Sequence, residues 1–436
     1  MSTGASGIVK NQDRLLSKDY VLLMFSSSVH ALMNQFFLAA APLYMVLIGG
    51  STLHAGMLAT VYSLTALAAR PISGMASDRI GRVKLLIGGA ALCAVTCALF
   101  GFASVLPLLL LVRGVTGVGF GVHSTCAGAA VADVLPKTRL AEGIGYFGLY
   151  ATLAQAIGPG IALAIIAKDR IVDFRALFLL TAGLCTASAL TNGCITYERK
   201  RKALEKADAA NDAGAVASDA VTEVGSVRTR VAVEAGAEGA LPKTFMGFEY
   251  SVFAPVAVLI LLQTGIAGIM VFMAPFARWK GFGNPGLFYT VSAVGTLLSR
   301  LVFGKVADRR GSDVIIIPGL AVLAACMAML PTVGSMGALV AFALPIGLSQ
   351  GAVSPTINSM MFRRSSPARR GTASGAYFSA IDLGYAIGAP LLGALVDARD
   401  YKVMYWVAAA FLALALLVYI LISTDRRYAK LNKINQ

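Results

Sequence analysis

Residues 74–84 read GMASDRIGRVK and place a charged segment between two long apolar runs. A similar segment, GKVADRRGSD, occupies residues 304–313. The rest of the chain is strongly apolar: 57% of its 436 residues are hydrophobic, 14% are charged, and the mean hydropathy is +0.74. A soluble domain of this composition would expose a largely apolar surface. The sequence therefore predicts a protein embedded in a lipid bilayer.

The apolar runs have the length of membrane-spanning helices, which need about 20 mostly apolar residues at a rise of 1.5 Å each. Continuous apolarity favours helices over a β-barrel, whose strands alternate apolar and polar residues. The predicted fold is all-α, with twelve transmembrane helices in two six-helix repeats. The spans are expected near residues 20–48, 53–76, 85–105, 107–133, 141–167, 174–195, 250–277, 285–306, 313–333, 335–361, 371–396 and 401–423.

The basic residues are distributed unevenly between the two sides of the predicted membrane. The formal net charge is +15, with 37 Lys and Arg residues. Seven of them fall in alternate loops, three lie within spans, and the rest lie in the termini and the other loops. The seven are Lys168, Arg170, Arg175, Arg278, Lys280, Arg399 and Lys402. By the positive-inside rule, both termini are expected in the cytoplasm and the protein in the cell (inner) membrane, with no nucleic-acid partner required.

Residues 197–248 interrupt the membrane pattern. The segment begins YERKRKALEKA and continues as a low-complexity mixture of Ala, Asp, Gly and Val. Such a mixture has too little apolar bulk to fold alone. We expect a largely disordered cytoplasmic linker between an N-terminal bundle, residues 1–196, and a C-terminal bundle, residues 249–424, with a cytoplasmic tail at 425–436. A regulatory role for the linker is the alternative.

The second half of the chain restates the first at an offset of 230 residues. Gly117 corresponds to Gly347, and the run Ala156–Ile157–Gly158 corresponds to Ala386–Ile387–Gly388. In the charged segments, Arg70, Gly74, Asp78, Arg79 and Gly81 correspond to Arg300, Gly304, Asp308, Arg309 and Gly311. A duplicated six-helix unit is typical of transporters whose halves rock around a site near the bilayer midplane.

Twelve helices in two repeats, with G-x-x-x-D-R-x-G-R after the second, resemble the major facilitator superfamily. The signature is carried by Gly74, Asp78, Arg79, Gly81 and Arg82, and its echo by Gly304, Asp308, Arg309 and Gly311. The resemblance implies a cytoplasmic gating motif that steadies the outward-facing state and releases in the inward-facing one. The alternative is a basic loop that only sets topology.

Two further motifs are similar to those of the drug:proton antiporter branch. LLLLVRGVTGVGFG places Arg113 in the fourth helix, and the fifth helix carries Gly145, Gly158 and Pro159. Ala154 stands where the branch has a glycine. This likeness implies proton-coupled efflux, by antiport, of a small organic compound. Proton-coupled import (symport) of a small metabolite or organic anion is the alternative.

Ionisable and polar residues deep in the spans are candidates for the proton and substrate site. Asp382 is the main candidate for proton coupling, because burial favours its protonated form and a nearby cation its ionised form. Arg113 and the histidines are candidates for contact with substrate or protons. Arg70, one turn before the glycine of the motif, is expected near the inner surface in a structural role. The full candidate set is Asp382, Arg113, His30, Asn34, His123, Gln155, Gln263, Gln350 and Tyr385.

Other classes of function find little support in the sequence. No metal-ligand spacing, nucleophile elbow or phosphate-binding loop is present, so we expect neither an enzyme nor a cofactor or metal requirement. A non-transporting membrane receptor is a remote alternative. The sequence predicts a monomer-competent secondary transporter that works by alternating access, with the lipid bilayer, protons and a small molecule as its partners.

Overall fold

The computed structural model describes residues 16–136, 139, 143, 146–166, 170–199, 203, 244–245, 248–365 and 370–434. Within these residues the fold is helical apart from one short hairpin. The strands β1 (Thr244–Phe245) and β2 (Phe248–Glu249) pair antiparallel just before the second half begins. Most of the predicted linker lies outside the described residues.

A helix lies at each of the twelve predicted spans. Ten of these helices are long and apolar enough to cross a membrane. The other two are α7, a shorter apolar helix, and α11, which carries a cluster of charges toward its end. The first half contains α2 (Lys18–Leu47), α3 (Thr52–Ile80), α4 (Arg82–Phe100), α5 (Leu106–Val134), α7 (Leu149–Ile165) and α8 (Ile171–Gly193). The second half contains α10 (Tyr250–Trp279), α11 (Gly286–Arg310), α12 (Asp313–Met329), the 3-10 turn η2 (Leu330–Thr332), α13 (Met336–Arg364), α14 (Arg370–Ala398) and α15 (Tyr401–Ile434).

Local sequence explains where several helices begin and end. Ser17 caps α2 by accepting a hydrogen bond from the Tyr20 amide, and Ser51 and His54 form a capping box at the start of α3. Gly81 separates α3 from α4 with φ of +99°, and Gly311 separates α11 from α12 with φ of +90°. Both glycines adopt the left-handed conformation that other residues rarely tolerate, so the turn of the charged segment is repeated in each half.

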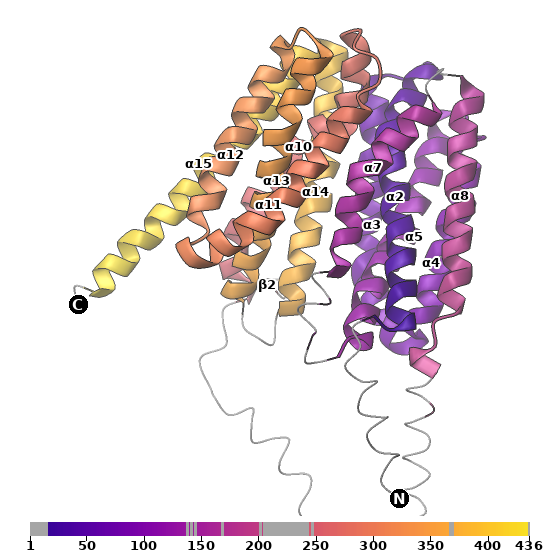
Figure 1. The fold of residues 1–436 in the computed structure, drawn as a ribbon, viewed down its shortest axis with the longest axis horizontal. Helices are drawn as coiled ribbons and strands as arrows, with labels where there is room; N and C mark the ends of the chain where they lie inside the picture. Colours follow the sequence, from indigo (N-terminus) through magenta and orange to yellow (C-terminus); the bar gives the residue numbers. More distant parts are fainter. Residues whose placement is uncertain are drawn as a thin grey trace, which may run out of the picture.

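The two halves lie side by side, and their helices run between the same two ends of the bundle (Figure 1). We call the end where α2 begins the terminal end, and the other the opposite end. Close packing inside each half follows the repeat. A Cβ on Gly117 would meet the Tyr62 carbonyl, and one on Gly347 would meet the Ser292 carbonyl. Small residues at these crossings allow neighbouring backbones to approach closely.

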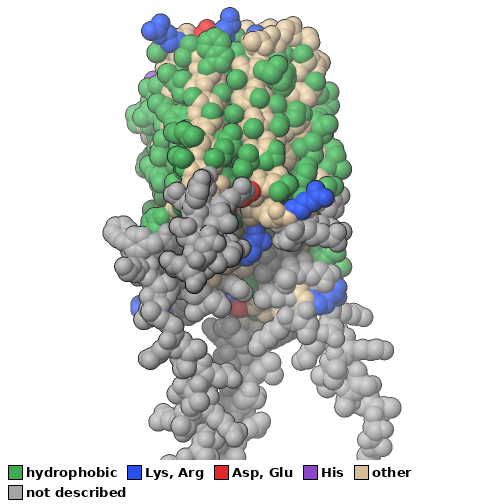
Figure 2. Space-filling model, turned by 90° about the vertical axis from the view of Figure 1, so that its left-hand side faces the viewer, with side chains coloured by type: hydrophobic (Ala, Val, Ile, Leu, Met, Phe, Trp, Pro, Cys, Tyr) green, Lys and Arg blue, Asp and Glu red, His purple; other side chains and the backbone are tan. Residues whose placement is uncertain are grey.

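The outer surface matches a lipid environment. Large apolar side chains are exposed on many helices, including Leu111 (64%), Leu190 (71%) and Leu421 (58%). The face shown in Figure 2 carries a tall band of apolar side chains, with Lys and Arg at its two ends. A soluble protein rarely exposes so much contiguous apolar area. The chain is therefore a multi-pass membrane protein.

Candidate functional site

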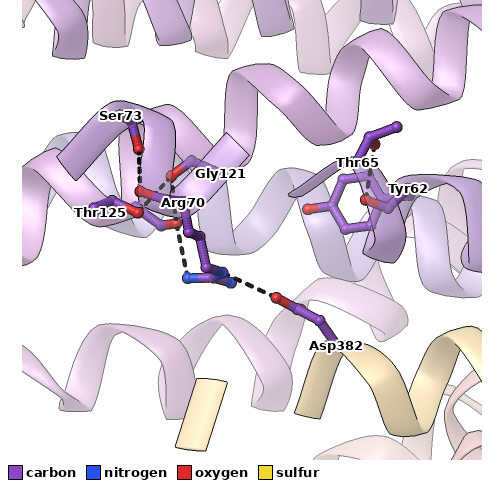
Figure 3. Close-up of polar contacts among 8 residues, drawn as sticks. Tyr62, Thr65, Arg70, Ser73, Gly121, Thr125 and Asp382 are labelled. Carbon is purple, nitrogen blue, oxygen red and sulfur yellow. Dashed lines mark hydrogen bonds and ion pairs between the residues drawn. The ribbon is translucent and has the colours of Figure 1, made fainter. Parts of the chain in front are cut away.

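An ion pair joins the two halves of the molecule. The Arg70 guanidinium on α3 donates from Nε to Oδ2 of Asp382 on α14 at 2.9 Å, and the two side chains are only 17% and 12% exposed. Arg70 also donates weakly to the Ser124 hydroxyl, at 3.4 Å, and lies over the Phe378 ring. Figure 3 shows the guanidinium directed at the carboxylate across the gap between the helices. This ion pair is compatible with the structural role expected for Arg70, and it adds a partner in the other half that the sequence did not name.

The helices that carry this pair pack tightly toward the opposite end. Asp397 accepts hydrogen bonds from the amides of Thr52 (2.9 Å) and Leu53 (2.7 Å), and so caps the start of α3. The Thr60 hydroxyl donates to the Ala386 carbonyl at 2.9 Å. These contacts fix how α3 and α14, which run antiparallel, are aligned. Extending the alignment from Ala386 back to Asp382 places Asp382 beside about residue 63 of α3. Arg70 begins about 10 Å further on, by the helical rise, so an extended arginine bridges the step.

A second interface between the halves, α7 against α11, repeats part of these contacts. The Thr290 hydroxyl donates to the Ala156 carbonyl at 3.3 Å, which is the Thr60–Ala386 contact shifted by 230 residues in each partner. Arg300 corresponds to Arg70 and donates to the Gly148 carbonyl at 3.3 Å. The position that corresponds to Asp382 is Thr152, whose hydroxyl is buried without a partner. The interfaces thus share part of their framework, but Thr152 and Ala167 stand at the positions of the α14 carboxylates Asp382 and Asp397.

Arg113 lies in the first half, and its partners are aromatic rings. Its guanidinium lies 3.9 Å from the centroid of the Tyr62 ring and 4.4 Å from that of Phe37. The residue is 2% exposed, and its Nη1 has no hydrogen-bond partner. A desolvated cation–π contact contributes ~2 kcal/mol, whereas burying a cation costs several kcal/mol. Arg113 is therefore only partly compensated, and its counterpart in the second half is the neutral Ala343.

The two histidine candidates form one buried cluster. The rings of His30 and His123 are stacked, with centroids 3.6 Å apart and an interplanar angle of 11°. The His30 Nδ1–H donates to the Ser26 carbonyl (2.9 Å), because a carbonyl can only accept, and Nε2 of His30 has no partner. The Ser26 hydroxyl contacts Nε2 of His123 and the Ser188 hydroxyl, each at 2.7 Å. Sequence reasoning did not include Ser26 in this cluster. Ser26 precedes His30 by one helical turn on α2, and this spacing could have identified it as a neighbour of the histidine.

The remaining polar candidates lie on helices of both halves. The side-chain oxygens of Asn34, Gln263 and Gln350 are buried without a partner. Gln155 and Tyr385 are half-buried. Sequence reasoning missed further buried and unpartnered hydroxyls on Tyr62, Thr152, Tyr289, Ser292 and Tyr405. Unsatisfied polar groups are costly inside a membrane protein, so each of these atoms would gain from a hydrogen bond to water or to another polar group.

The charged segment at residues 74–84 is fixed within the first half. Arg82 forms an ion pair with Asp133 at the end of α5 and donates to the Ala129 carbonyl at 2.9 Å. Glu198 accepts from the Arg82 amide at 2.5 Å and from the Val83 amide, which caps α4. Among the residues that the structure describes, none lies within 4 Å of the position that a Cβ on Gly74 would take, so no close helix contact is seen there.

The other motif positions differ in how much of their surroundings is described. Gly145 lies outside the described residues, as do the side-chain surroundings of Asp78, Gly304, Asp308 and Arg309. In α7, a Cβ on Gly158 would lie 2.7 Å from the Gln35 side chain, so this glycine permits close packing of α7 on α2, and Pro159 follows it inside the helix. Arg79 is exposed.

The arrangement agrees with a match to a known family. The model of the Major Facilitator Superfamily matches residues 23–389 and 259–435. The chain belongs to the Major Facilitator Superfamily. It is therefore a transporter of small molecules and not an enzyme.

Relatives within the superfamily include named exporters. The Staphylopine export protein of Staphylococcus aureus is 24% identical over 392 residues, covering 88% of this chain and 90% of the relative. The Multidrug resistance protein MdtG of Proteus mirabilis is 24% identical over 375 residues, covering 85% and 87%. Both alignments span nearly the whole superfamily fold.

Solved structures of other superfamily members share the architecture. A bacterial homolog of the human lysosomal transporter Spinster, inward-facing and unoccupied, has a TM-score of 0.71 at 16% identity, covering 93% of this chain and 96% of that one. The nucleoside transporter NupG has a TM-score of 0.67 at 12% identity, covering 93% and 98%. At these identities the likeness shows the fold alone.

Proposed function

We propose that this superfamily member exports a small organic compound in exchange for protons, by alternating access, and that Asp382 is the coupling carboxylate. The observation that carries the proposal is the Arg70–Asp382 ion pair between the halves. The names of the two full-length relatives, an export protein and a multidrug resistance protein, support the outward direction.

The ion pair can couple protonation to the movement of the halves. Ionised Asp382 attracts Arg70 and ties α14 to α3, whereas protonated Asp382 loses most of this attraction. Removing one charge from a buried pair costs ~3–5 kcal/mol, enough to shift a conformational equilibrium strongly. A proton that binds Asp382 in one state and leaves it in the other therefore drives the cycle.

Asp382 is the carboxylate that pairs with an arginine of the other half, and its repeat position holds no acid. The α7–α11 contact keeps the arginine and the threonine hydrogen bond but has Thr152 in place of the acid. We assign proton sensing to the α3–α14 interface and a purely mechanical role to α7–α11. Because only the α3–α14 interface has a carboxylate facing its arginine, we propose that one proton binds at Asp382 in each transport cycle.

The gating motif and the topology complete the proposal. We infer that Gly81 and Arg82 anchor the charged turn to α5 and that Asp78 and Arg79 contribute to the gate, as do Gly304, Asp308, Arg309 and Gly311 in the second half. The asymmetry of basic residues supports cytoplasmic termini in an inner membrane. We propose that one chain is the working unit and that residues 197–248 tether its halves.

The proposal is tested by proton flux in proteoliposomes that contain an internal pH dye. Ethidium, tetraphenylphosphonium, benzoate and indole-3-acetate are added in turn to vesicles with the unaltered chain and with Asp382→Asn. We expect at least one compound to drive a pH change that Asp382→Asn abolishes. The sign of the change separates antiport from the second candidate, symport.

A matched control is available on the same helix. Asp397→Asn removes another carboxylate that contacts α3, at its capped end, and should retain compound-driven proton flux. Equal proton flux through Asp382→Asn and the unaltered chain would exclude Asp382 as the coupling group. The proposal also fails if none of the compounds moves protons through the unaltered chain.

A further inference from the structure

Arg113 lies over the Tyr62 ring, and each of these two side chains carries a buried polar atom without a partner. Its Nη1 and the Tyr62 hydroxyl are both buried without a hydrogen-bond partner, although the guanidinium lies only 3.9 Å from the centre of the Tyr62 ring. We propose that Arg113 and Tyr62 form a subsite for the carboxylate of an organic acid. The proposal deepens the proposed function, and it rests on that function for the claim that the bound acid is cargo.

The contacts that Arg113 makes leave its N–H groups available. Both neighbouring rings, Tyr62 and Phe37, interact with the guanidinium as cation–π partners, and neither ring supplies a hydrogen-bond acceptor. No carboxylate among the described residues pairs with Arg113. The nearby side chains of Cys93 and Cys97 are buried thiols and not carboxylates. The missing partner of this cation is thus an acceptor from outside the chain.

The donor geometry favours a carboxylate. A guanidinium presents its N–H groups in one plane as a fork that matches the two oxygens of a carboxylate. The Tyr62 hydroxyl can donate a further hydrogen bond to the same group. The aromatic rings around the guanidinium suit an acid with an apolar or aromatic body, because such a body packs favourably against them.

The subsite lies next to the coupling pair. In the packing of α3 against α14, Asp382 lies at about the same height as residue 63, the residue after Tyr62. Arg113, Arg70 and Asp382 are all close enough to interact electrostatically with Tyr62. Arg70 offsets the charge of Asp382 and so limits its repulsion of a bound acid. Cargo and proton are thereby placed in one region, where each can influence the other through Tyr62 and Arg70.

Thermal stability of the purified full-length chain in detergent tests the subsite without any transport assay. The probes are benzoate and indole-3-acetate, each compared with its uncharged amide, benzamide and indole-3-acetamide. We expect an acid, but not its amide, to raise the Tm. Arg113→Gln should weaken the binding of that acid by about tenfold to a hundredfold, and Arg113→Lys by less, as expected for a charged hydrogen-bonded contact.

Tyr62→Phe removes one oxygen and leaves the ring, and it should weaken binding by about twofold to tenfold. Tyr405→Phe is the matched control, because Tyr405 also has a buried and unpartnered hydroxyl but lies in the other half. It should bind the acid as the unaltered chain does. If Arg113→Gln does not fold, Arg113→Lys and Tyr62→Phe still test the site.

Three results would overturn the subsite: no shift with either acid, equal shifts with acid and amide, or affinities unchanged in both Tyr62→Phe and the Arg113 variants. The outcome is separable from that of the proposed function. Acid binding without proton flux would keep the subsite and reject proton coupling. Proton flux driven only by ethidium or tetraphenylphosphonium, with no acid binding, would support proton coupling and reject the subsite.

Discussion

Asp382 and Thr152 occupy equivalent positions in the two repeats, each on the helix that faces an arginine of the other half. Asp382 accepts from Arg70, whereas the Thr152 hydroxyl has no partner and Arg300 donates to a backbone carbonyl instead. The repeat thus built two similar interfaces, and Asp382 gives one of them an ion pair with the facing arginine. This difference leads to the first prediction.

Thr152→Asp should create a second ion pair, with Arg300, at the α7–α11 interface. Because an added cross-interface pair stabilises the state in which the halves are tied, we expect slower transport. The measurement is the initial rate of compound-driven proton flux in proteoliposomes. Thr152→Asn is the control, since it adds similar bulk without charge. Equal rates in the Asp and Asn variants would show that Arg300 is not available as a partner.

Arg70→Gln should leave Asp382 as a buried, uncompensated acid and destabilise the fold by ~3–5 kcal/mol at neutral pH. A lone buried carboxyl is more stable when protonated, so the Tm of this variant should rise as the pH falls. The Arg70→Gln, Asp382→Asn double variant should recover most of the loss and show a weaker pH response. Arg300→Gln, its repeat counterpart, is the control. A Tm of Arg70→Gln that does not change with pH contradicts the prediction.

The stacked histidines should make the first half sensitive to acid. Two imidazolium rings 3.6 Å apart would repel each other by ~5 kcal/mol at an effective dielectric constant of 20, so the cluster admits one proton at most. We expect the Tm to fall between pH 7 and pH 5, and to fall less in His30→Phe. Thermal unfolding in detergent at several pH values measures this. His54→Phe, outside the cluster, removes a cap of α3 and should lower the Tm at every pH, but its fall between pH 7 and pH 5 should match that of the unaltered chain. An identical fall in His30→Phe would count against the interpretation.

The glycine crossings should tolerate no side chain. Gly117→Ala places a methyl group against the Tyr62 carbonyl, and overpacking of this kind costs ~1–3 kcal/mol. Gly128→Ala on the same helix meets nothing within 4 Å, and it should be neutral or stabilising by up to ~1 kcal/mol. The Tm values of the two variants provide the comparison. Similar Tm values for both would mean that α3 and α5 can shift apart without cost.

The sequence by itself determined the spans, the repeat and the family motif. The backbone of an apolar run of about 20 residues can satisfy its hydrogen bonds inside a membrane as a helix. The offset of 230 residues pairs Gly81 with Gly311, and in the structure both adopt a positive φ at the turn between two helices. Asp382 and Arg113 could be chosen as candidates because a charge inside a span is costly wherever it occurs.

Only the tertiary structure decided which of these groups meet. Arg70 and Asp382 are 312 residues apart, and neither helix carries a local signal that names the other as its partner. His30 and His123 were chosen separately and lie ring on ring, whereas Arg113 meets Tyr62 and Phe37 instead of the acid. Helix periodicity is local and can be read from neighbouring residues. Partner choice depends instead on the register and crossing of helices distant in sequence, and on how far a long side chain extends between them.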